Sequence, residues 1–303
     1  MNILNFAIFT DLHFDHIPDG YERLSQFIQK IKNHNLNFVI QLGDLCIPKD
    51  ENKYLLELLE SINIPIYHVL GNHDSDLFSK KEILKFFKLN NSYYCFKYGN
   101  IKFIVLDTCF IKRNNQYFSF NIDNYNKSTD IYPILPDYEF DWLQNELNDD
   151  ENLFYIIFSH HSLENNFNNR GIFNRVEIQN LINNVNTPKK KILCCINGHD
   201  HADSIDLIHK THYISLNSMS YIWCGPEYEH FDYSQKTHEQ FPFLKDLILY
   251  KDPLYATITI NNIGTLFLNG LTSDYKSNSP LTLNMPSSWN GRDLSSKISS
   301  FII

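Results

Sequence analysis

Residues 5–13 read NFAIFTDLH, an apolar run followed at once by an aspartate and a histidine. The first six of these residues predict a buried β-strand, so Asp11 and His13 stand just after its carboxyl end. Strands predicted at 38–42 and 65–70 are likewise followed by a glycine and a polar residue. In an open α/β sheet, the carboxyl ends of the strands form the crevice that binds ligands. We therefore expect a functional site at these strand ends.

The spacing of apolar residues along the rest of the chain predicts an α/β fold. Helices are expected at 21–34, 53–62, 79–88, 137–147 and 175–185. Further strands are expected at 93–98, 101–106, 154–158, 192–196, 213–216, 256–260 and 265–268. The Gly99-Asn100 pair favours a two-residue hairpin turn, so antiparallel strands are expected to join a parallel core.

Two segments lack clean periodicity. Residues 110–136 are rich in Asn, Tyr, Phe and Asp and exceed an ordinary connection in length, so we interpret them as an insertion. The polar segment 271–303 is expected to form a C-terminal extension or wrap. The catalytic domain would then span residues 1–270.

The composition bears on the partners of this 303-residue chain. Its formal net charge is -9, which makes extended nucleic acid an unlikely partner, because such binding depends on clustered Lys and Arg. The N-terminus lacks the pattern of a signal peptide. No apolar run reaches the roughly 20 residues of a membrane-spanning helix. We expect a cytoplasmic protein that acts on a small molecule away from membranes, and the oligomeric state stays open.

Five short polar motifs follow predicted strands. They are Thr10-Asp11-Leu12-His13, Gly43-Asp44, Gly71-Asn72-His73-Asp74, Ser159-His160-His161 and Gly198-His199-Asp200-His201. Such a cluster of carboxylates, imidazoles and an amide is costly to desolvate without a compensating charge. Bound metal ions would offset this cost, because carboxylates and neutral imidazoles are metal ligands. The motifs together therefore predict a metal centre, and the glycines would permit close backbone approach beside the ligands.

As a set, these motifs resemble the calcineurin-like metallophosphoesterases, whose pattern is D-x-H, GD, GNH(D/E), H and GHxH in that order. The resemblance implies a four-layer α/β/β/α sandwich with mixed sheets and an active site at the strand ends. It also implies a dinuclear metal centre. The implied ligands are Asp11, His13, Asp44, Asn72, His160, His199 and His201.

The same resemblance divides these ligands between two metals. Asp11, His13 and His201 would hold one metal, Asn72, His160 and His199 would hold the other, and Asp44 would bridge both. His161 competes with His160 for the ligand role, and we prefer His160 because the family places the ligand directly after the strand. The metals are two divalent or mixed-valence ions of Fe, Mn, Zn or Co, since mixed nitrogen and oxygen ligands do not distinguish these elements.

The resemblance implies a metal-dependent phosphoesterase. Such an enzyme hydrolyses a phosphodiester or a phosphomonoester by attack of a metal-bridging hydroxide. By resemblance His73 would be catalytic, stabilising the phosphoryl oxygens or protonating the leaving group. Asp74 or another nearby carboxylate would orient the His73 ring, or else Asp74 or Asp76 would cap a helix.

Other features narrow the subfamily. Ile47 stands where purple acid phosphatases carry a tyrosine ligand, which argues against that group. The helix that contains Trp142 and Leu143 resembles the branch that includes bacterial cyclic-nucleotide phosphodiesterases, so a small phosphate ester such as a nucleotide is favoured. The alternatives are a non-catalytic binding scaffold with this fold and a nuclease of the same superfamily. Retention of His73 and of every ligand position favours an enzyme.

Overall fold

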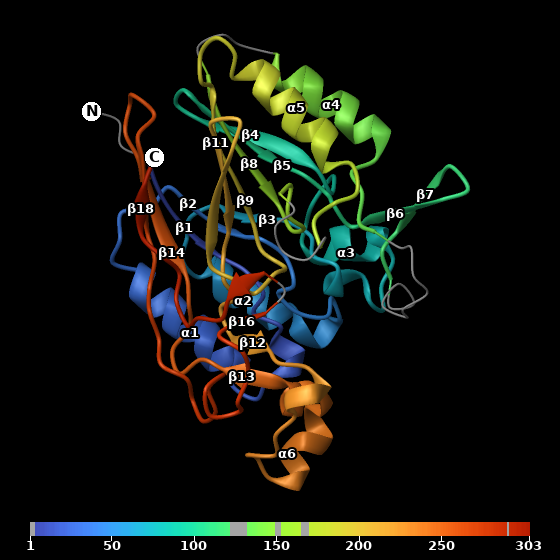
Figure 1. Cartoon of the computed structure of the whole chain (residues 1–303), viewed down its shortest axis with the longest axis vertical. Coiled ribbons are helices and arrows are strands. Elements are labelled where there is room, and N and C mark those ends of the chain that lie inside the picture. Colours follow the sequence, from blue (N-terminus) through green and yellow to red (C-terminus); the bar gives the residue numbers. More distant parts are fainter. Residues whose placement is uncertain (1–3, 122–131, 149–152, 165–169, 290) are drawn as a thin grey trace.

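Two six-stranded sheets form the centre of the structure (Figure 1). The structure is a computed structural model that describes residues 4–121, 132–148, 153–164, 170–289 and 291–303. Within these residues, no helix is both long enough and apolar enough to cross a membrane.

The first sheet carries the strand that opens the chain. Its strands are β1 (Leu4–Phe9), β2 (Phe38–Gln41), β3 (Ile66–His68), β14 (Ala256–Ile260), β15 (Leu266–Asn269) and β18 (Phe301–Ile302). They lie in the order β18-β15-β14-β1-β2-β3. β1 runs parallel to β2 and antiparallel to β14, so the sheet is mixed, as predicted.

The second sheet is also mixed. Its strands are β4 (Tyr94–Tyr98), β5 (Ile101–Val105), β8 (Phe154–Ser159), β9 (Ile192–Asn197), β10 (Ser204–Ile208) and β11 (Thr211–Ser215). They lie in the order β10-β11-β9-β8-β5-β4, with β5, β8, β9 and β11 parallel and the two edge strands antiparallel. The predicted hairpin across Gly99-Asn100 joins β4 to β5, which confirms that prediction.

Helices cover the outer face of each sheet. The helices are α1 (Gly20–Ile31), α2 (Lys53–Glu60), α3 (Lys80–Phe86), α4 (Asp137–Leu147) and α5 (Arg175–Val185). Buried side chains of α1, α2 and α3 pack on the first sheet, and those of α4 and α5 pack on the second. Along β1, Ala7 and Phe9 face the helices while Phe6 and Ile8 face the other sheet, because successive side chains of a strand point to opposite faces.

Aromatic side chains fill the space between the sheets. The ring of Phe6 stacks on that of Phe38 with centroids 4.5 Å apart, and it meets the edge of Phe103 from the second sheet at 5.6 Å. Such aromatic pairs contribute about 0.5–1.5 kcal/mol beyond the area that they bury. The sheets therefore form the two inner layers of a four-layer α/β/β/α sandwich, which confirms the predicted fold class.

Local sequence signals account for several helix ends. Ser79 precedes α3 and forms a capping box with Glu82: its backbone N–H donates to Oε2 of Glu82 at 2.8 Å. This reciprocal pairing satisfies two backbone N–H groups that a helix start leaves without partners. The ends of α4 and α5 coincide with those predicted.

Several short elements were not predicted. They are β6 (Phe110–Arg113), β7 (Gln116–Ser119), β12 (Tyr221–Trp223), α6 (Gln235–Gln240), β13 (Leu247–Leu249), β16 (Ser288–Trp289) and β17 (Arg292–Asp293). β10 was missed as well. These elements have six residues or fewer, so periodicity is too weak to reveal them. The hairpin β6–β7 lies in the segment interpreted as an insertion, of which residues 122–131 lie outside the described part of the chain.

The segment after residue 270 packs against both halves of the fold. β18 extends the first sheet by pairing with β15. Arg292 is buried and donates to Glu164 and Asp206, which lie in the half that contains the second sheet. The boundary between the catalytic domain and a C-terminal extension at residue 270 stays a prediction. The contacts show that the segment reaches from the first sheet to the half that contains the second sheet.

Candidate metal centre

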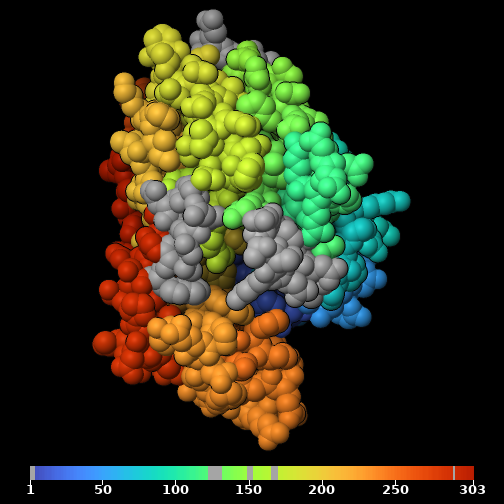
Figure 2. Space-filling view, turned by 45° about the vertical axis from the view of Figure 1, so that its right-hand side comes forward, coloured from blue at the N-terminus to red at the C-terminus, as the bar shows by residue number. Residues whose placement is uncertain are grey.

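The five predicted motifs meet where the two sheets adjoin. Asp11, Asp44 and Asn72 follow β1, β2 and β3 of the first sheet, while His160 and His199 follow β8 and β9 of the second. Figure 2 shows a hollow whose floor includes blue N-terminal atoms, bounded below by the orange segment. Because parallel strands end at the same edge of a sheet, side chains far apart in sequence converge here.

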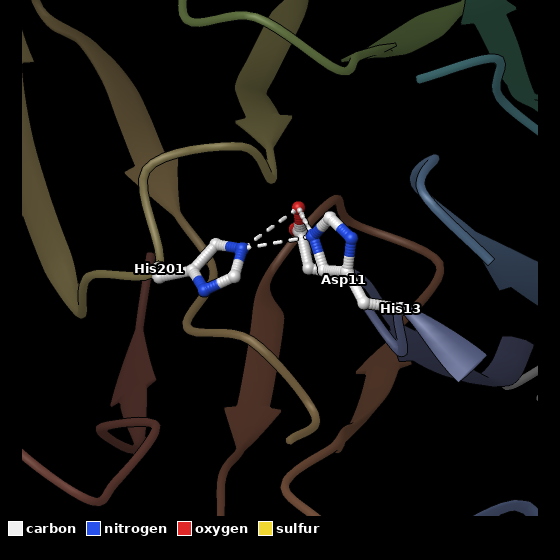
Figure 3. A group of neighbouring side chains, drawn as sticks. All are labelled: Asp11, His13 and His201. Carbon is white, nitrogen blue, oxygen red and sulfur yellow. Dashed lines mark hydrogen bonds and ion pairs between the residues drawn. The ribbon is translucent and has the colours of Figure 1, made fainter. Parts of the chain in front are cut away.

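The first group of predicted ligands consists of Asp11, His13 and His201. Nε2 of His201 lies 3.2 Å from Oδ1 of Asp11 and 3.2 Å from Nε2 of His13 (Figure 3). The other oxygen of Asp11 is held by protein donors: it accepts from Oγ1 of Thr10 at 2.5 Å and from the backbone N–H of His199 at 3.0 Å. Oδ1 and the two imidazoles therefore face one another.

The second group consists of Asp44, His160 and His199. Nε2 of His160 lies 3.2 Å from Oδ2 of Asp44 and 2.9 Å from Oδ1 of Asn72, so the predicted amide ligand belongs to the same cluster. Oδ2 of Asp44 also lies 3.6 Å from Nε2 of His13 in the first group. Asp44 therefore stands between the two groups, which suits the bridging role that we predict for it.

Backbone carbonyls orient two of the imidazoles. Nδ1 of His160 lies 2.7 Å from the carbonyl oxygen of Leu42, and Nδ1 of His201 lies 3.0 Å from that of Tyr221. A carbonyl can only accept, so Nδ1 carries a hydrogen in each ring, and the neutral form of the ring has its lone pair on Nε2. Those Nε2 atoms point into the groups described above, because a hydrogen bond from the other ring nitrogen fixes the orientation of a metal-binding histidine.

His161 is not a member of either group. Its Nδ1 lies 3.1 Å from Oγ1 of Thr108, and its ring packs against His199 with centroids 4.3 Å apart. His161 is fully buried, so it acts as a supporting contact of His199. This geometry favours His160 over His161 as the ligand.

Backbone strain is concentrated in the cluster. Five residues of the cluster have a backbone in the left-handed region, with φ values between 46° and 67°: these are Asp11, His13, Asp44, His199 and His201. This conformation is uncommon outside glycine, and sparsely populated backbone conformations cost about 1–3 kcal/mol each. Residues held in this way cluster at functional sites, where the surrounding fold maintains the geometry.

Glycines allow the strand-end loops to approach closely. A β-carbon at Gly71 would lie 2.1 Å from Oδ1 of Asp44, and one at Gly198 would lie 2.0 Å from Oγ1 of Thr10. Real β-carbons do not come this close to other heavy atoms. The predicted close approach beside the ligands is therefore present at both positions.

His73 lies beside the two groups without joining either. Its backbone N–H donates to Oδ1 of Asp44 at 2.8 Å, and its Nδ1 lies 2.9 Å from Oδ2 of Asp76. Burial alone would lower the pKa of His73, but the carboxylates of Asp44 and Asp76 outweigh burial and raise it. The carboxylate that contacts the ring is thus Asp76, and the i, i+3 spacing was the sequence signal for it. Asp74 instead accepts from the backbone N–H of Gly71 at 2.7 Å.

Arg170 adds a positive charge that the short motifs did not reveal. Its Nη2 lies 3.2 Å from Nε2 of His199, and its Nε lies 3.4 Å from Oδ1 of Asp200. The side chain is partly exposed at the edge of the second group. A guanidinium in this place is suited to bind a phosphate oxygen.

The chemistry of these donors fits two metal ions. Oδ1 of Asp11 is buried and makes no hydrogen bond of acceptable geometry within the described residues, although two imidazoles lie within 3.5 Å. Burial would raise the pKa of Asp11, but the neighbouring imidazoles, His201 above all, outweigh burial and lower it. A bound dication would supply the positive charge that keeps this carboxylate ionised, and the neutral imidazoles would then be its ligands.

A helix-flanked pair of mixed sheets, with two groups of histidine and aspartate at the strand ends, is typical of dinuclear metallohydrolases. The family model for calcineurin-like phosphoesterases matches residues 4–203, and the chain belongs to this family. The predicted family is therefore confirmed.

Comparisons with individual proteins extend this result. The chain is 30% identical over 119 residues to the manganese-dependent ADP-ribose/CDP-alcohol diphosphatase of Arabidopsis thaliana, a match that covers 31% of this chain and 38% of that protein. A dimetal phosphatase from Danio rerio has a similar fold, with a TM-score of 0.64, 13% identity and coverage of 91% and 99% of the two chains. So does GAP50, the anchor in the inner membrane complex of Plasmodium, with a TM-score of 0.54, 16% identity and coverage of 92% and 87%.

Proposed function

We propose that this chain is a dinuclear metal-dependent hydrolase of small phosphate esters or diphosphates. The observation that carries the proposal is the pair of ligand groups with Asp44 between them, within hydrogen-bonding reach of His160 and beside His13. The fold alone does not decide between catalysis and binding, because a fold can host unrelated functions. The presence of every ligand position, together with His73, supports catalysis.

Asp11, His13 and His201 would hold one ion, Asn72, His160 and His199 the other, and Asp44 both. When bound, two such ions supply Lewis-acid polarisation of the phosphoryl group and lower the pKa of water. His73 would donate a hydrogen bond or a proton to the leaving oxygen, with its ring held by Asp76. Arg170 would bind a phosphoryl oxygen at the edge of the second group.

The name of the Arabidopsis relative supports a nucleoside diphosphate derivative as substrate and manganese as one metal to test. The matched region is 38% of that protein's length, so this substrate class is itself part of the proposal. It is consistent with the acidic chain, which disfavours extended nucleic acid.

The test is hydrolysis by protein reconstituted with manganese. We would assay p-nitrophenyl phosphate, bis-p-nitrophenyl phosphate, ADP-ribose and CDP-glycerol, and measure bound metal by mass spectrometry. Asp44→Asn removes the shared ligand, so we expect loss of metal and of hydrolysis. Asp50→Asn is the matched control, because Asp50 is an exposed surface residue paired with Lys53. Equal, metal-independent hydrolysis by all three proteins would overturn the proposal in favour of a binding scaffold.

A further inference from the structure

A histidine outside the ligand motifs borders the candidate metal centre. His16 ends the short 3₁₀ helix Phe14–His16, and its ring stacks on that of His13 with centroids 5.1 Å apart and 14° between the planes. The His16 ring also meets that of His73 edge-on at 5.7 Å. His16 is partly exposed and lines the recess that contains His13, Asp44 and His73. A substrate bound in this recess can therefore reach the His16 side chain.

Phe243 extends this aromatic surface away from the ligands. Its ring lies 4.9 Å from that of His16 and 6.0 Å from that of Trp223 on β12. The Phe243 side chain is 47% exposed, whereas the next residue, Leu244, is fully buried in a cluster that includes Ile17. Because Ile17 follows His16, one buried cluster fixes both segments. The segment that carries Phe243 belongs to the orange part that bounds the hollow from below in Figure 2.

The rings of His16, Phe243 and Trp223 are not covered by a positive charge. Among the described residues, no lysine or arginine lies over any of these three rings. Lys245, two positions after Phe243, is paired with Glu229 at 2.7 Å. A partly exposed aromatic surface beside a ligand site is suited to stack on a nucleobase, because every base has a flat π-face.

We propose that the aromatic surface of His16 and Phe243 binds the nucleobase of a nucleoside phosphate ester, with the base stacked on Phe243. The inference rests on the proposed function, because the phosphoryl group is placed at the metal centre. The structure thereby assigns Phe243 the role of a specificity residue for nucleotide substrates.

The spacing of the rings favours a nucleoside over an aryl ester. A ring bonded directly to the ester oxygen would lie beside His73. Phe243 is farther from the centre, since the His16 ring lies between it and the ligand His13 in this series of contacts. In a 5′-nucleotide the ribose separates the phosphate from the base and provides the spacer that this arrangement requires.

Binding of non-hydrolysable phosphonates tests this inference without turnover. Calorimetry on manganese-loaded protein would compare the phosphonate isostere of AMP, in which CH₂ replaces the ester oxygen, with the same compound carrying hydrogen in place of adenine. Methylphosphonate would report on the metal centre alone. We expect the wild type to bind the AMP isostere about five- to a hundredfold more tightly than the base-free compound, the usual contribution of one base stacked on an aromatic side chain.

Phe243→Ala removes the proposed stacking partner. The variant should fold, because the side chain is about half exposed and lies outside the buried cluster of Leu244. We expect the preference for the AMP isostere to fall to about twofold or less, with the affinity for methylphosphonate unchanged. Phe231→Ala is the matched control, because Phe231 is 64% exposed and its ring packs on His238. This control should keep the preference of the wild type.

Two further variants distinguish stacking from general apolar contact. Phe243→Trp keeps an aromatic face and should retain the preference for the base. Phe243→Leu keeps apolar volume without a ring and should behave like Phe243→Ala. Thermal unfolding would verify that each variant is folded. A full preference in a folded Phe243→Leu protein would contradict the stacking role of Phe243.

The outcomes separate this inference from the proposed function. Equal binding of the AMP isostere and the base-free compound by the wild type, or an unaltered preference in Phe243→Ala, would overturn the stacking inference and leave the metal-dependent activity standing. A base preference that depends on Phe243, without hydrolysis of any ester, would support the inference and overturn the enzyme. Failure of every phosphonate to bind would overturn both.

Discussion

Oδ2 of Asp76 lies 2.9 Å from Nδ1 of His73. Because the carboxylate engages Nδ1, this contact orients the ring and places a hydrogen on Nδ1. A hydrogen bond to a carboxylate also stabilises the positive charge of a protonated imidazole. The pair is therefore arranged to present an oriented N–H donor beside the candidate metal centre.

We predict that His73→Asn acts on leaving-group departure. For an alkyl phosphate ester, kcat should fall about 10²- to 10⁴-fold, the usual contribution of general acid catalysis. The loss should be smaller for p-nitrophenyl phosphate, since p-nitrophenolate departs without protonation. Asp76→Asn should act in the same direction by about ten- to a hundredfold. The measurement is kcat for both esters, and equal losses with both leaving groups would point to a structural role.

Gly71→Ala should disrupt the centre. A β-carbon there would lie 2.1 Å from Oδ1 and 2.4 Å from the backbone nitrogen of Asp44, so the loop that carries Asp44 must shift. We expect a loss of about 1–3 kcal/mol in the free energy of unfolding, with loss of bound metal. Gly99→Ala is the control: apart from the adjacent residues, no described residue has an atom within 4 Å of an added β-carbon, and its φ of 57° is the unfavourable feature. It should cost about 1–2 kcal/mol and leave bound metal intact. Urea unfolding and metal analysis distinguish the two variants.

His68 predicts a pH dependence of stability. Burial lowers its pKa to about 3, and its Nδ1 lies 3.2 Å from Nε2 of Gln41. As the pH falls through about 6.5, His68 of the unfolded chain takes up a proton, whereas His68 of the folded chain stays neutral. The free energy of unfolding therefore falls as the pH drops below that value. From pH 7 to pH 5 this residue should cost about 2 kcal/mol.

The measurement is urea unfolding at pH 7 and pH 5. His68→Gln should lose less stability than the wild type over this interval, by about 2 kcal/mol. His34→Gln, at an exposed position, serves as the control and should follow the wild type. A His68→Gln protein with the same pH dependence as the wild type would contradict the prediction.

Substitution of Arg292 would show how much its ion pairs contribute to the stability of the protein and to the attachment of the C-terminal segment. Its Nη2 donates to Oε2 of the buried Glu164 at 2.6 Å, and its Nη1 donates to Asp206 at 2.9 Å. Arg292→Met removes the cation but leaves the buried carboxylate, so stability should fall by about 3–5 kcal/mol. Lys245→Met breaks an exposed pair with Glu229 and should change the stability much less, because surface ion pairs contribute little. Chemical unfolding compares the variants, and similar losses would contradict the predicted role of burial.

Much of the fold could be predicted because its signals are local. The amphipathic spacing in α4 and α5 lies within 11 residues each, and the capping box of α3 lies within four positions. The short strands β12 and β13 pair across 20 or more residues, and their stability comes from that pairing. A window as short as one strand or helix contains only one of the two partners, so periodicity could not reveal them.

From local periodicity, the α/β class and the polar residues that follow the strands could be predicted. The order of the polar motifs predicted the family, and the resemblance to that family implied the four-layer fold. The contacts of those residues depend on the folded structure. It turned His160 toward Asp44 and His161 toward Thr108, and it placed Asp76 rather than Asp74 against His73. It also left Oγ of Ser75 buried without a described partner. Neighbouring residues of the same kind, His160 and His161 or Asp74 and Asp76, have different contacts because their partners come from segments that only folding brings together.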